Sequence, residues 1–174
     1  QLFDIADADQ GIVHVISPEL GIALPGLSLI CPDSHTCTLG GLGALAWGVG
    51  STEAEHALAT STLRVTRPQT MRVSFAGLLG EDVSAKDLIL FTIRELSASG
   101  GAGYAIEFAG PAIDALPVEA RLTLCNMTTE LSAFTGLIAP DQKVLDYCEG
   151  RRYAPQDELW DQAAQHWQSL RSDG

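Results

Sequence analysis

Positively charged residues are scarce in this sequence. The 174 residues include eight arginines and two lysines against 22 acidic residues, which gives a formal net charge of −12. The basic residues form no patch, so we expect neither nucleic acid nor an anionic membrane as a partner. The same shortage raises a problem for any acidic substrate, because little cationic charge is available to hold it.

Long apolar runs are also missing. The longest apolar stretches, such as Leu27 to Cys31, fall far short of a membrane span, and no basic-then-apolar signal segment opens the sequence. Hydrophobic residues make up 46% and charged residues only 18%, which indicates a packed globular protein and not a disordered one. A chain of 174 residues suits one large or two small domains.

The cysteines lack the spacings of common cysteine-based sites. Cys31, Cys37, Cys125 and Cys148 fit neither a zinc-binding C-x-x-C pair nor a small disulfide scaffold, so we expect a reduced, cytoplasmic protein. The sequence begins with Gln1 instead of Met and has no obvious start signal. We therefore expect it to be a piece of a longer chain.

The remaining pattern alternates strands with helices. Strands are predicted over 27–30, 71–76, 104–109 and 135–139. Helices are predicted over 11–20, 39–49, 51–63, 85–98, 117–131 and 157–169, with Ser51 and Ser84 as caps. This alternation predicts an α/β fold in layers, with mostly parallel strands.

The most informative segment is Asp33-Ser34-His35, which follows a buried strand and Pro32. An acid, a hydroxyl and an imidazole in consecutive positions can hardly all be absorbed by a core, and the carboxyl ends of strands bind ligands in α/β folds. The alternative is a turn in which Asp33 or Ser34 satisfies backbone donors while His35 packs. A catalytic role requires a partner that orients the imidazole.

Two further polar groups have both structural and functional interpretations. His14 is a solitary histidine in a short apolar segment, and it becomes a candidate for proton transfer only if it meets Asp33. Asn126 and Glu130 are four residues apart and share one face of a predicted helix. An unsatisfied buried polar group costs about 1–3 kcal/mol, so these two residues need either partners or a solvated face.

Other patterns are weak. Gly41, Gly43 and Ala46 fit the dinucleotide pattern G-x-G-x-x-A, but the preceding strand lies about ten residues away and no acid ends a second strand. Cys31, Cys37 and His35 lack the spacing of a tetrahedral metal site. His56 and His166 lie on predicted helices, where solvent-facing positions explain them.

With these motifs in hand, the whole chain resembles the aconitase family of iron–sulfur hydro-lyases, and within it the branch of 3-isopropylmalate dehydratase large subunits. The segments that carry the resemblance are Gly11–Val15, Asp33–Thr36 with Gly40–Gly43, Ser51–Thr60, and Thr123–Met127 with Glu130. The resemblance implies three-layer α/β/α domains with mostly parallel sheets. Residues 1–69 would form the C-terminal part of a first such domain, and residues 70–174 most of a second.

The resemblance implies a reaction and a cofactor for the parent protein. The family removes water from a hydroxy-di- or tricarboxylate and adds it back at the neighbouring carbon. A [4Fe–4S] cluster, one iron of which lacks a cysteine ligand, acts there as a Lewis acid. For this branch the expected reaction interconverts 2- and 3-isopropylmalate in leucine biosynthesis. The alternatives are a related dehydratase acting on methylmalate- or citrate-like acids, and a non-catalytic assembly domain.

The resemblance also assigns roles to residues. Asp33 and His35 would contact the water or hydroxyl, His14 would pair with Asp33, and Glu130 would pair with His35. Ser34 would touch the substrate, and Asn126 would lie beside the cluster.

The family's cluster cysteines have no counterpart in this chain, so none of its four cysteines is an expected ligand and we expect neither metal nor activity on the isolated chain. The remaining segments of the large subunit and a small subunit would supply these cysteines, the catalytic serine loop and the substrate-binding arginines. Substrate choice in the family resides largely outside these residues.

Overall fold

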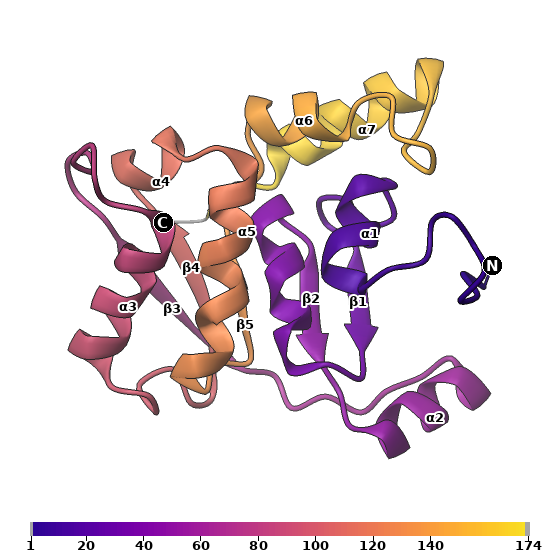
Figure 1. The fold of residues 1–174 in the computed structure, drawn as a ribbon, viewed down its shortest axis with the longest axis horizontal. Coiled ribbons are helices and arrows are strands. Elements are labelled where there is room, and N and C mark those ends of the chain that lie inside the picture. Colours follow the sequence, from indigo (N-terminus) through magenta and orange to yellow (C-terminus); the bar gives the residue numbers. More distant parts are fainter. Residues whose placement is uncertain (1, 173–174) are drawn as a thin grey trace.

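The computed structural model describes residues 2–172 and contains two small parallel sheets surrounded by helices (Figure 1). Strand β1 (Ser28–Cys31) pairs with β2 (Leu45–Gly48). The second sheet has the strand order β3 (Gln69–Ser74), β4 (Tyr104–Ala109), β5 (Thr135–Leu137), and both of its pairings are parallel. The predicted α/β class with parallel strands is confirmed.

Helices connect and cover these strands. They are α1 (Val13–Glu19), the 3₁₀-helix η1 (Ser34–Leu42), α2 (Ser51–Thr60), α3 (Ala85–Leu96), α4 (Pro111–Ala115), α5 (Val118–Asn126), the 3₁₀-helix η2 (Met127–Leu131), α6 (Gln142–Cys148) and α7 (Asp157–Ser169). Ser84 caps α3 as predicted, because its hydroxyl accepts the Asp87 N–H and the Asp87 carboxylate accepts the Ser84 N–H. In Figure 1, α2 stands apart from the body of the molecule.

Two predictions about the helices are wrong, and a third holds with a change of helix type. The predicted helix over 39–49 is the end of η1 followed by β2, because Gly43 adopts a left-handed conformation (φ 81°) and ends the helix. The N-cap of α2 is Gly50, not Ser51, and the Glu53 carboxylate accepts the Gly50 N–H at 2.8 Å. The predicted helix over 117–131 tightens into a 3₁₀-helix at Met127.

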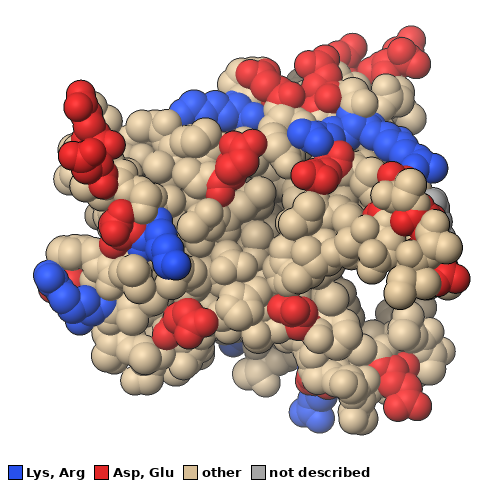
Figure 2. Space-filling view, in the orientation of Figure 1, with Lys and Arg blue, Asp and Glu red and all other residues tan. Residues whose placement is uncertain are grey.

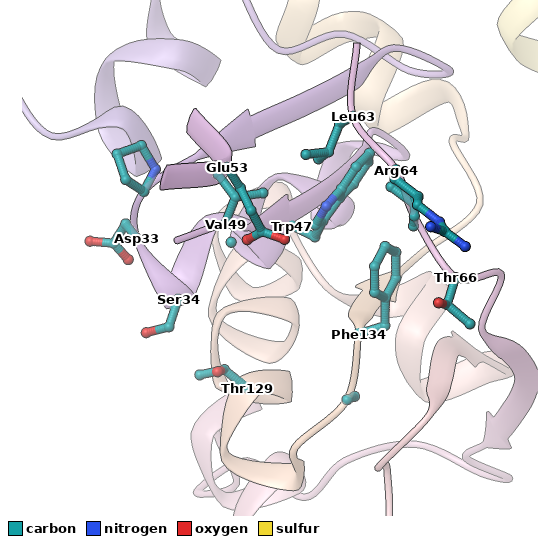
Figure 3. A pocket seen from close by; sticks show the side chains of 14 residues that line it. Asp33, Ser34, Trp47, Val49, Glu53, Leu63, Arg64, Thr66, Thr129 and Phe134 are labelled. Atoms are coloured by element: carbon teal, nitrogen blue, oxygen red, sulfur yellow. The ribbon is translucent and has the colours of Figure 1, made fainter. Parts of the chain in front are cut away.

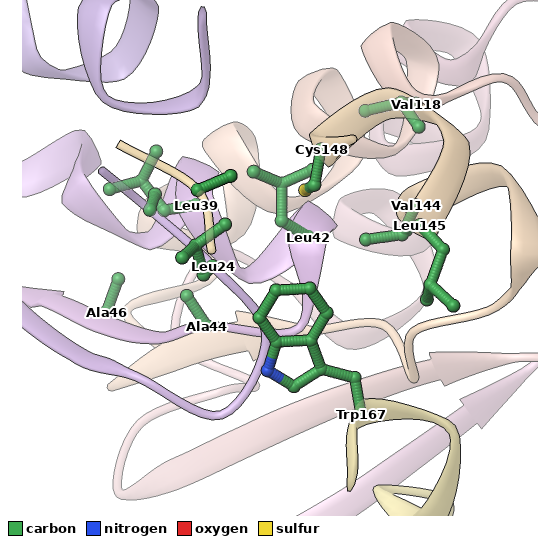
Figure 4. Packing of buried hydrophobic residues seen from close by; sticks show 12 residues of the cluster. Leu24, Leu39, Leu42, Ala44, Ala46, Val118, Val144, Leu145, Cys148 and Trp167 are labelled. Carbon is green, nitrogen blue, oxygen red and sulfur yellow. The ribbon is translucent and has the colours of Figure 1, made fainter. Parts of the chain in front are cut away.

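Buried side chains form two clusters. The first lies around β1, β2 and η1 and is closed by α6 and α7, with Trp167 at its centre (Figure 4). The second lies between α3, α5 and β4, with Ile89, Ile106 and Leu124 fully buried. The first cluster joins residues from both sides of position 69, so the helices near the C-terminus help to cover the first sheet. The domain boundary at residue 69 stays a prediction.

Glycines allow η1 to pack closely against its neighbours. A Cβ at Gly40 would lie 1.7 Å from the carbonyl oxygen of Gly136 in β5, and a Cβ at Gly41 would lie 2.7 Å from the backbone nitrogen of Leu122 in α5. The glycine-rich segment therefore serves packing, and it leads from a helix into a strand instead of from a strand into a helix, as a dinucleotide site requires. This close approach brings the start of η1 next to the end of α5.

The surface carries scattered charge. On the face drawn in Figure 2, Lys and Arg side chains lie singly or in small groups among acidic ones, without a continuous basic patch. One arginine is buried instead: Arg121 is 1% exposed, and its guanidinium contacts the Asp141 carboxylate at 2.5 Å and the carbonyl oxygen of Leu116 at 3.2 Å. Within residues 2–172 no helix combines the length and the apolar character that crossing a membrane requires.

Candidate functional site

The site begins where β1 ends. Pro32 follows the strand, and Asp33 then caps η1, since its Oδ1 accepts the His35 backbone N–H at 2.8 Å. The turn that was weighed against a catalytic role is therefore present, but it uses only part of the Asp33 carboxylate. The parallel pairing of Cys31 with Gly48 places the carboxyl ends of β1 and β2 at one edge of their sheet, where α/β proteins bind ligands.

His14 and Asp33 form the first imidazole–carboxylate pair. The Nε2 atom of His14 lies 3.2 Å from Oδ1 of Asp33, and the His14 side chain is 9% exposed. The two atoms are not aligned for a hydrogen bond, so both ring nitrogens of His14 are buried without a hydrogen-bond partner within the described residues. An unsatisfied polar group of this kind costs about 1–3 kcal/mol, which favours a further polar group facing the ring from outside this chain.

His35 and Glu130 form the second pair. The Nε2 atom of His35 lies 3.5 Å from Oε1 of Glu130, while the hydroxyl of Ser34 lies 3.2 Å from Nδ1 of His35. Nδ1 also lies 3.8 Å from Oδ1 of Asp33, so carboxylates flank this imidazole on both sides. The two imidazole rings are 6.4 Å apart between centroids. The structure thus brings together all four residues that the sequence nominated for proton transfer.

Glu130 and Asn126 do not form the buried polar helix face that was one of the two interpretations of their spacing. The Glu130 side chain is 54% exposed, because the chain tightens into η2 beyond Asn126 and turns this residue outward. Asn126 is half-buried and has a partner: its amide donates to Oγ1 of Thr38 at 2.8 Å. The Thr38 hydroxyl in turn donates to the His35 carbonyl oxygen at 2.6 Å. Sequence reasoning missed Thr38, which lies among apolar and small residues and carries no motif.

The four cysteines do not suit an iron–sulfur cluster. Such clusters are held by thiolates. Burial raises the pKa of Cys37 to about 11, the pKa of Cys148 to about 11, and the pKa of Cys125 well above its ordinary value. Burial also raises the pKa of the half-buried Cys31. Nowhere in residues 2–172 do three His, Cys, Asp or Glu side chains come together in a way that could hold a metal ion. The residues of this chain therefore do not fit the cluster as ligands.

The other two histidines lie outside the site. His56 is exposed on α2, with its Nε2 atom 3.4 Å from the Thr62 hydroxyl, and His166 is exposed on α7. Both positions agree with the solvent-facing interpretation.

A cavity of about 610 Å³ adjoins Asp33 and Ser34 (Figure 3). It is walled by the end of β2, by the segment that follows α2, and by the loop before β5. Its lining includes Trp47, Glu53, Leu63, Arg64, Thr129 and Phe134. These residues come from distant parts of the sequence and form no local pattern, so nothing in the sequence predicted the cavity.

Two comparisons with known proteins found matches to this chain. The sequence model of a family described as "Aconitase family (aconitate hydratase)" matches residues 1–174. The 3-isopropylmalate dehydratase large subunit 1 of Bradyrhizobium diazoefficiens is 58% identical over 173 residues. That alignment covers 99% of this chain and 36% of the relative, so the chain spans about a third of the length of the curated relative that it matches.

Proposed function

This chain belongs to the aconitase family, and from that premise we propose that it is part of a 3-isopropylmalate dehydratase large subunit, a hydro-lyase of leucine biosynthesis. The observation that carries the proposal is the juxtaposition of two imidazole–carboxylate pairs, His14 with Asp33 and His35 with Glu130. The 58% identity to a relative of that name supports this branch of the family.

The chemistry requires groups that move protons. Dehydration of a hydroxy-dicarboxylate breaks a C–O bond and a C–H bond at the neighbouring carbon, and it forms a C=C bond and water. A hydroxyl leaves readily only when it gains a proton, which a positioned imidazole can supply as a general acid. In the reverse reaction the same imidazole takes a proton from water.

In this assignment His35 transfers the proton at the hydroxyl oxygen, and Glu130 exchanges it with the imidazole across 3.5 Å. Asp33 orients His35 through the backbone N–H and faces its Nδ1, while Ser34 contacts the substrate. His14 faces the same Asp33 oxygen, Oδ1, through its Nε2 atom. Thr38 holds the backbone of His35 by donating a hydrogen bond to its carbonyl oxygen, and Asn126 in turn donates to the Thr38 hydroxyl.

The missing parts of the reaction belong to other segments in this proposal. In the parent protein a [4Fe–4S] cluster supplies Lewis acidity, and its cysteines lie outside this chain. The base that removes the carbon-bound proton, and most of the arginines that hold the substrate carboxylates, come from the rest of the large subunit and from the small subunit. This division explains why a chain with only ten basic residues can serve an acidic substrate. We place the assembled enzyme in the cytoplasm, as the four free cysteines predict.

The proposal is tested by assay of the complete large subunit assembled with its small subunit. We expect interconversion of 2- and 3-isopropylmalate, with accumulation of an unsaturated diacid that is followed in the ultraviolet. Turnover of citrate- or methylmalate-like acids in preference to isopropylmalate would assign the chain to another branch of the family. Absence of turnover of any hydroxyacid would favour the non-catalytic assembly domain.

A second experiment tests the proposed division of labour. Iron and sulfide added anaerobically to the isolated 174-residue chain should give no stable visible absorbance band, because its thiols are buried and protonated. A stable cluster on this chain would show that it carries ligands of its own.

A further inference from the structure

The cavity beside Asp33 and Ser34 has an aromatic wall. The rings of Trp47, at the end of β2, and Phe134, before β5, lie 5.2 Å apart between centroids at an interplanar angle of 30°. Leu63 and Val49 extend this apolar surface (Figure 3). Trp47 and Phe134 are both only half-buried, so the exposed parts of their rings are available to a ligand.

One cationic side chain lines the cavity within residues 2–172. Arg64 is the only Lys or Arg that lines it in the described part of the chain, and its guanidinium forms no ion pair within residues 2–172. Among the described residues, Glu53 is the one carboxylate besides Asp33 that lines the cavity, and it is held at the start of α2 by the Gly50 N–H. An unpaired arginine beside an apolar wall suits a ligand that carries an alkyl group next to a carboxylate.

The cavity adjoins the candidate proton-transfer site, because Asp33 lines the cavity and also faces His14 and His35. Asp33 and Ser34 lie at its end away from Phe134, as Figure 3 shows, and Pro32 also lines the cavity. Gly48 lets the end of β2 pack closely against the backbone of Asp33, since a Cβ there would lie 2.5 Å from the Asp33 carbonyl oxygen. A substrate whose hydroxyl meets His35 can therefore extend past Ser34 into the cavity.

We propose that this cavity is the specificity pocket of the enzyme, in which Trp47 and Phe134 pack the alkyl substituent of the hydroxy-dicarboxylate and Arg64 pairs with one of its carboxylates. The inference rests on the proposed function and deepens it. It assigns to this chain a share of substrate recognition that the family resemblance places elsewhere. Removal or addition of one methylene in such a pocket changes kcat/KM about 10- to 200-fold, so alkyl preference is a sensitive readout.

The test uses the complete large subunit assembled with its small subunit and compares malates that bear methyl, isopropyl and longer branched substituents. Phe134→Trp fills the cavity and should shift the kcat/KM ratio toward methyl over isopropyl at least tenfold. Phe134→Ala enlarges it and should shift the ratio toward the longer substituents by a similar factor. Arg64→Gln should raise KM for all of them at least tenfold, while kcat changes less than threefold.

The control is Leu58→Ala, whose side chain is 88% exposed on α2 and does not line the cavity, so it should leave every ratio unchanged. If both Phe134 variants keep the wild-type melting temperature and the wild-type alkyl ratios, the pocket assignment is overturned. If the wild-type assembly turns over no hydroxyacid, the proposed function fails independently. Calorimetric affinities of alkylsuccinates for the same variants then decide the pocket: the same shift in rank supports it, and unchanged ranks overturn it.

Discussion

One carboxylate oxygen of Asp33 takes part in both the local turn and the candidate site. Its Oδ1 atom accepts the His35 N–H at 2.8 Å and lies 3.2 Å from Nε2 of His14. Residues at N-cap positions are often explained fully by their hydrogen bond to the backbone. Here the cap leaves the carboxylate charge free to face the two imidazoles, so structural and chemical roles can be separated by substitution.

Asp33→Asn separates these roles. An amide oxygen caps a helix about as well as a carboxylate. The free energy of unfolding of the complete protein should therefore change by no more than about 1 kcal/mol, and its melting temperature should change little. The charge that faces His14 and His35 is lost, so we expect kcat to fall at least about 100-fold.

Asp33→Ala is the comparison for Asp33→Asn, because it removes the cap as well and should cost about 1 kcal/mol more. A fully active Asn variant would limit Asp33 to a capping role. Thermal unfolding and steady-state kinetics give the two readouts.

For single residues, the sequence pointed to the candidate chemical groups but not to the residues that hold them in place. Asp33, Ser34 and His35 were visible because three reactive side chains follow a strand end, where a core cannot absorb them. Thr38 carried no such signal, since a threonine among small residues commonly packs. Trp47 and Phe134 are 87 positions apart and meet only after both sheets have formed.

Among the elements, η1 determines whether the site assembles, because it joins the end of β1 to the body of the molecule. Its glycines permit backbone contact with β5 and α5, and that contact sets the distance between His35 and Glu130. A helix followed by a strand replaced the single helix predicted over 39–49. Small apolar residues suit a helix and a strand alike. The left-handed turn at Gly43 and the pairing of β2 with β1 decide that the segment after Gly43 is a strand.

Gly40→Ala tests this packing. The added methyl carbon would lie 1.7 Å from the Gly136 carbonyl oxygen, so η1 and β5 must separate, at a cost of about 3 kcal/mol or more. We expect a lower melting temperature for the complete protein together with reduced activity. Gly80→Ala is the matched control, because the nearest atom to its Cβ is 3.7 Å away, on Val83. Equal melting temperatures for the two variants would show that the close approach is not required.

The buried arginine gives an element-scale prediction about pH. Partial burial alone would raise the pKa of Asp141, but the hydrogen bond and charge of Arg121 outweigh it and lower that pKa below 3.8. A carboxyl group with a lowered pKa stabilises the fold above its unfolded pKa of about 3.9, and it loses that contribution as pH falls through the folded value.

Asp141→Asn keeps the cap of α6 but leaves Arg121 without its anion, so it should destabilise the protein by about 1–3 kcal/mol at pH 7. The difference from wild type should shrink below about pH 4. Asp161→Asn, at an exposed position on α7, is the control and should change little. Melting temperatures measured between pH 7 and pH 3 check this, and a constant difference across that range would contradict it.

For the whole molecule, the alternation of strands and helices was enough to predict the α/β class, since parallel strands need crossover helices between them. It was not enough to predict which helices close which core. Trp167 near the end of the chain completes the core around β1 and β2, and such long-range packing leaves no periodic signal in either segment. The short helices α4 and α6, of five and seven residues, were missed because each is too brief for its apolar residues to show a helical spacing.

The molecule presents its candidate site at an open edge. The His14 nitrogens lack hydrogen-bond partners within residues 2–172, and Glu130 is more than half exposed. The chain also spans only 36% of its relative. An incomplete pocket that already holds the candidate proton-transfer groups is what we expect of a chain that supplies one wall of a larger site.

The most direct test of this account is the turnover number of Glu130→Gln in the complete large subunit assembled with its small subunit. Gln keeps the size of Glu130 but cannot exchange a proton with His35, so we expect kcat to fall about 10²- to 10⁴-fold with an unchanged melting temperature. Glu149→Gln, at an exposed position after α6, serves as the control and should retain full activity. A Glu130→Gln enzyme with the wild-type kcat would contradict the assignment of these pairs to proton transfer.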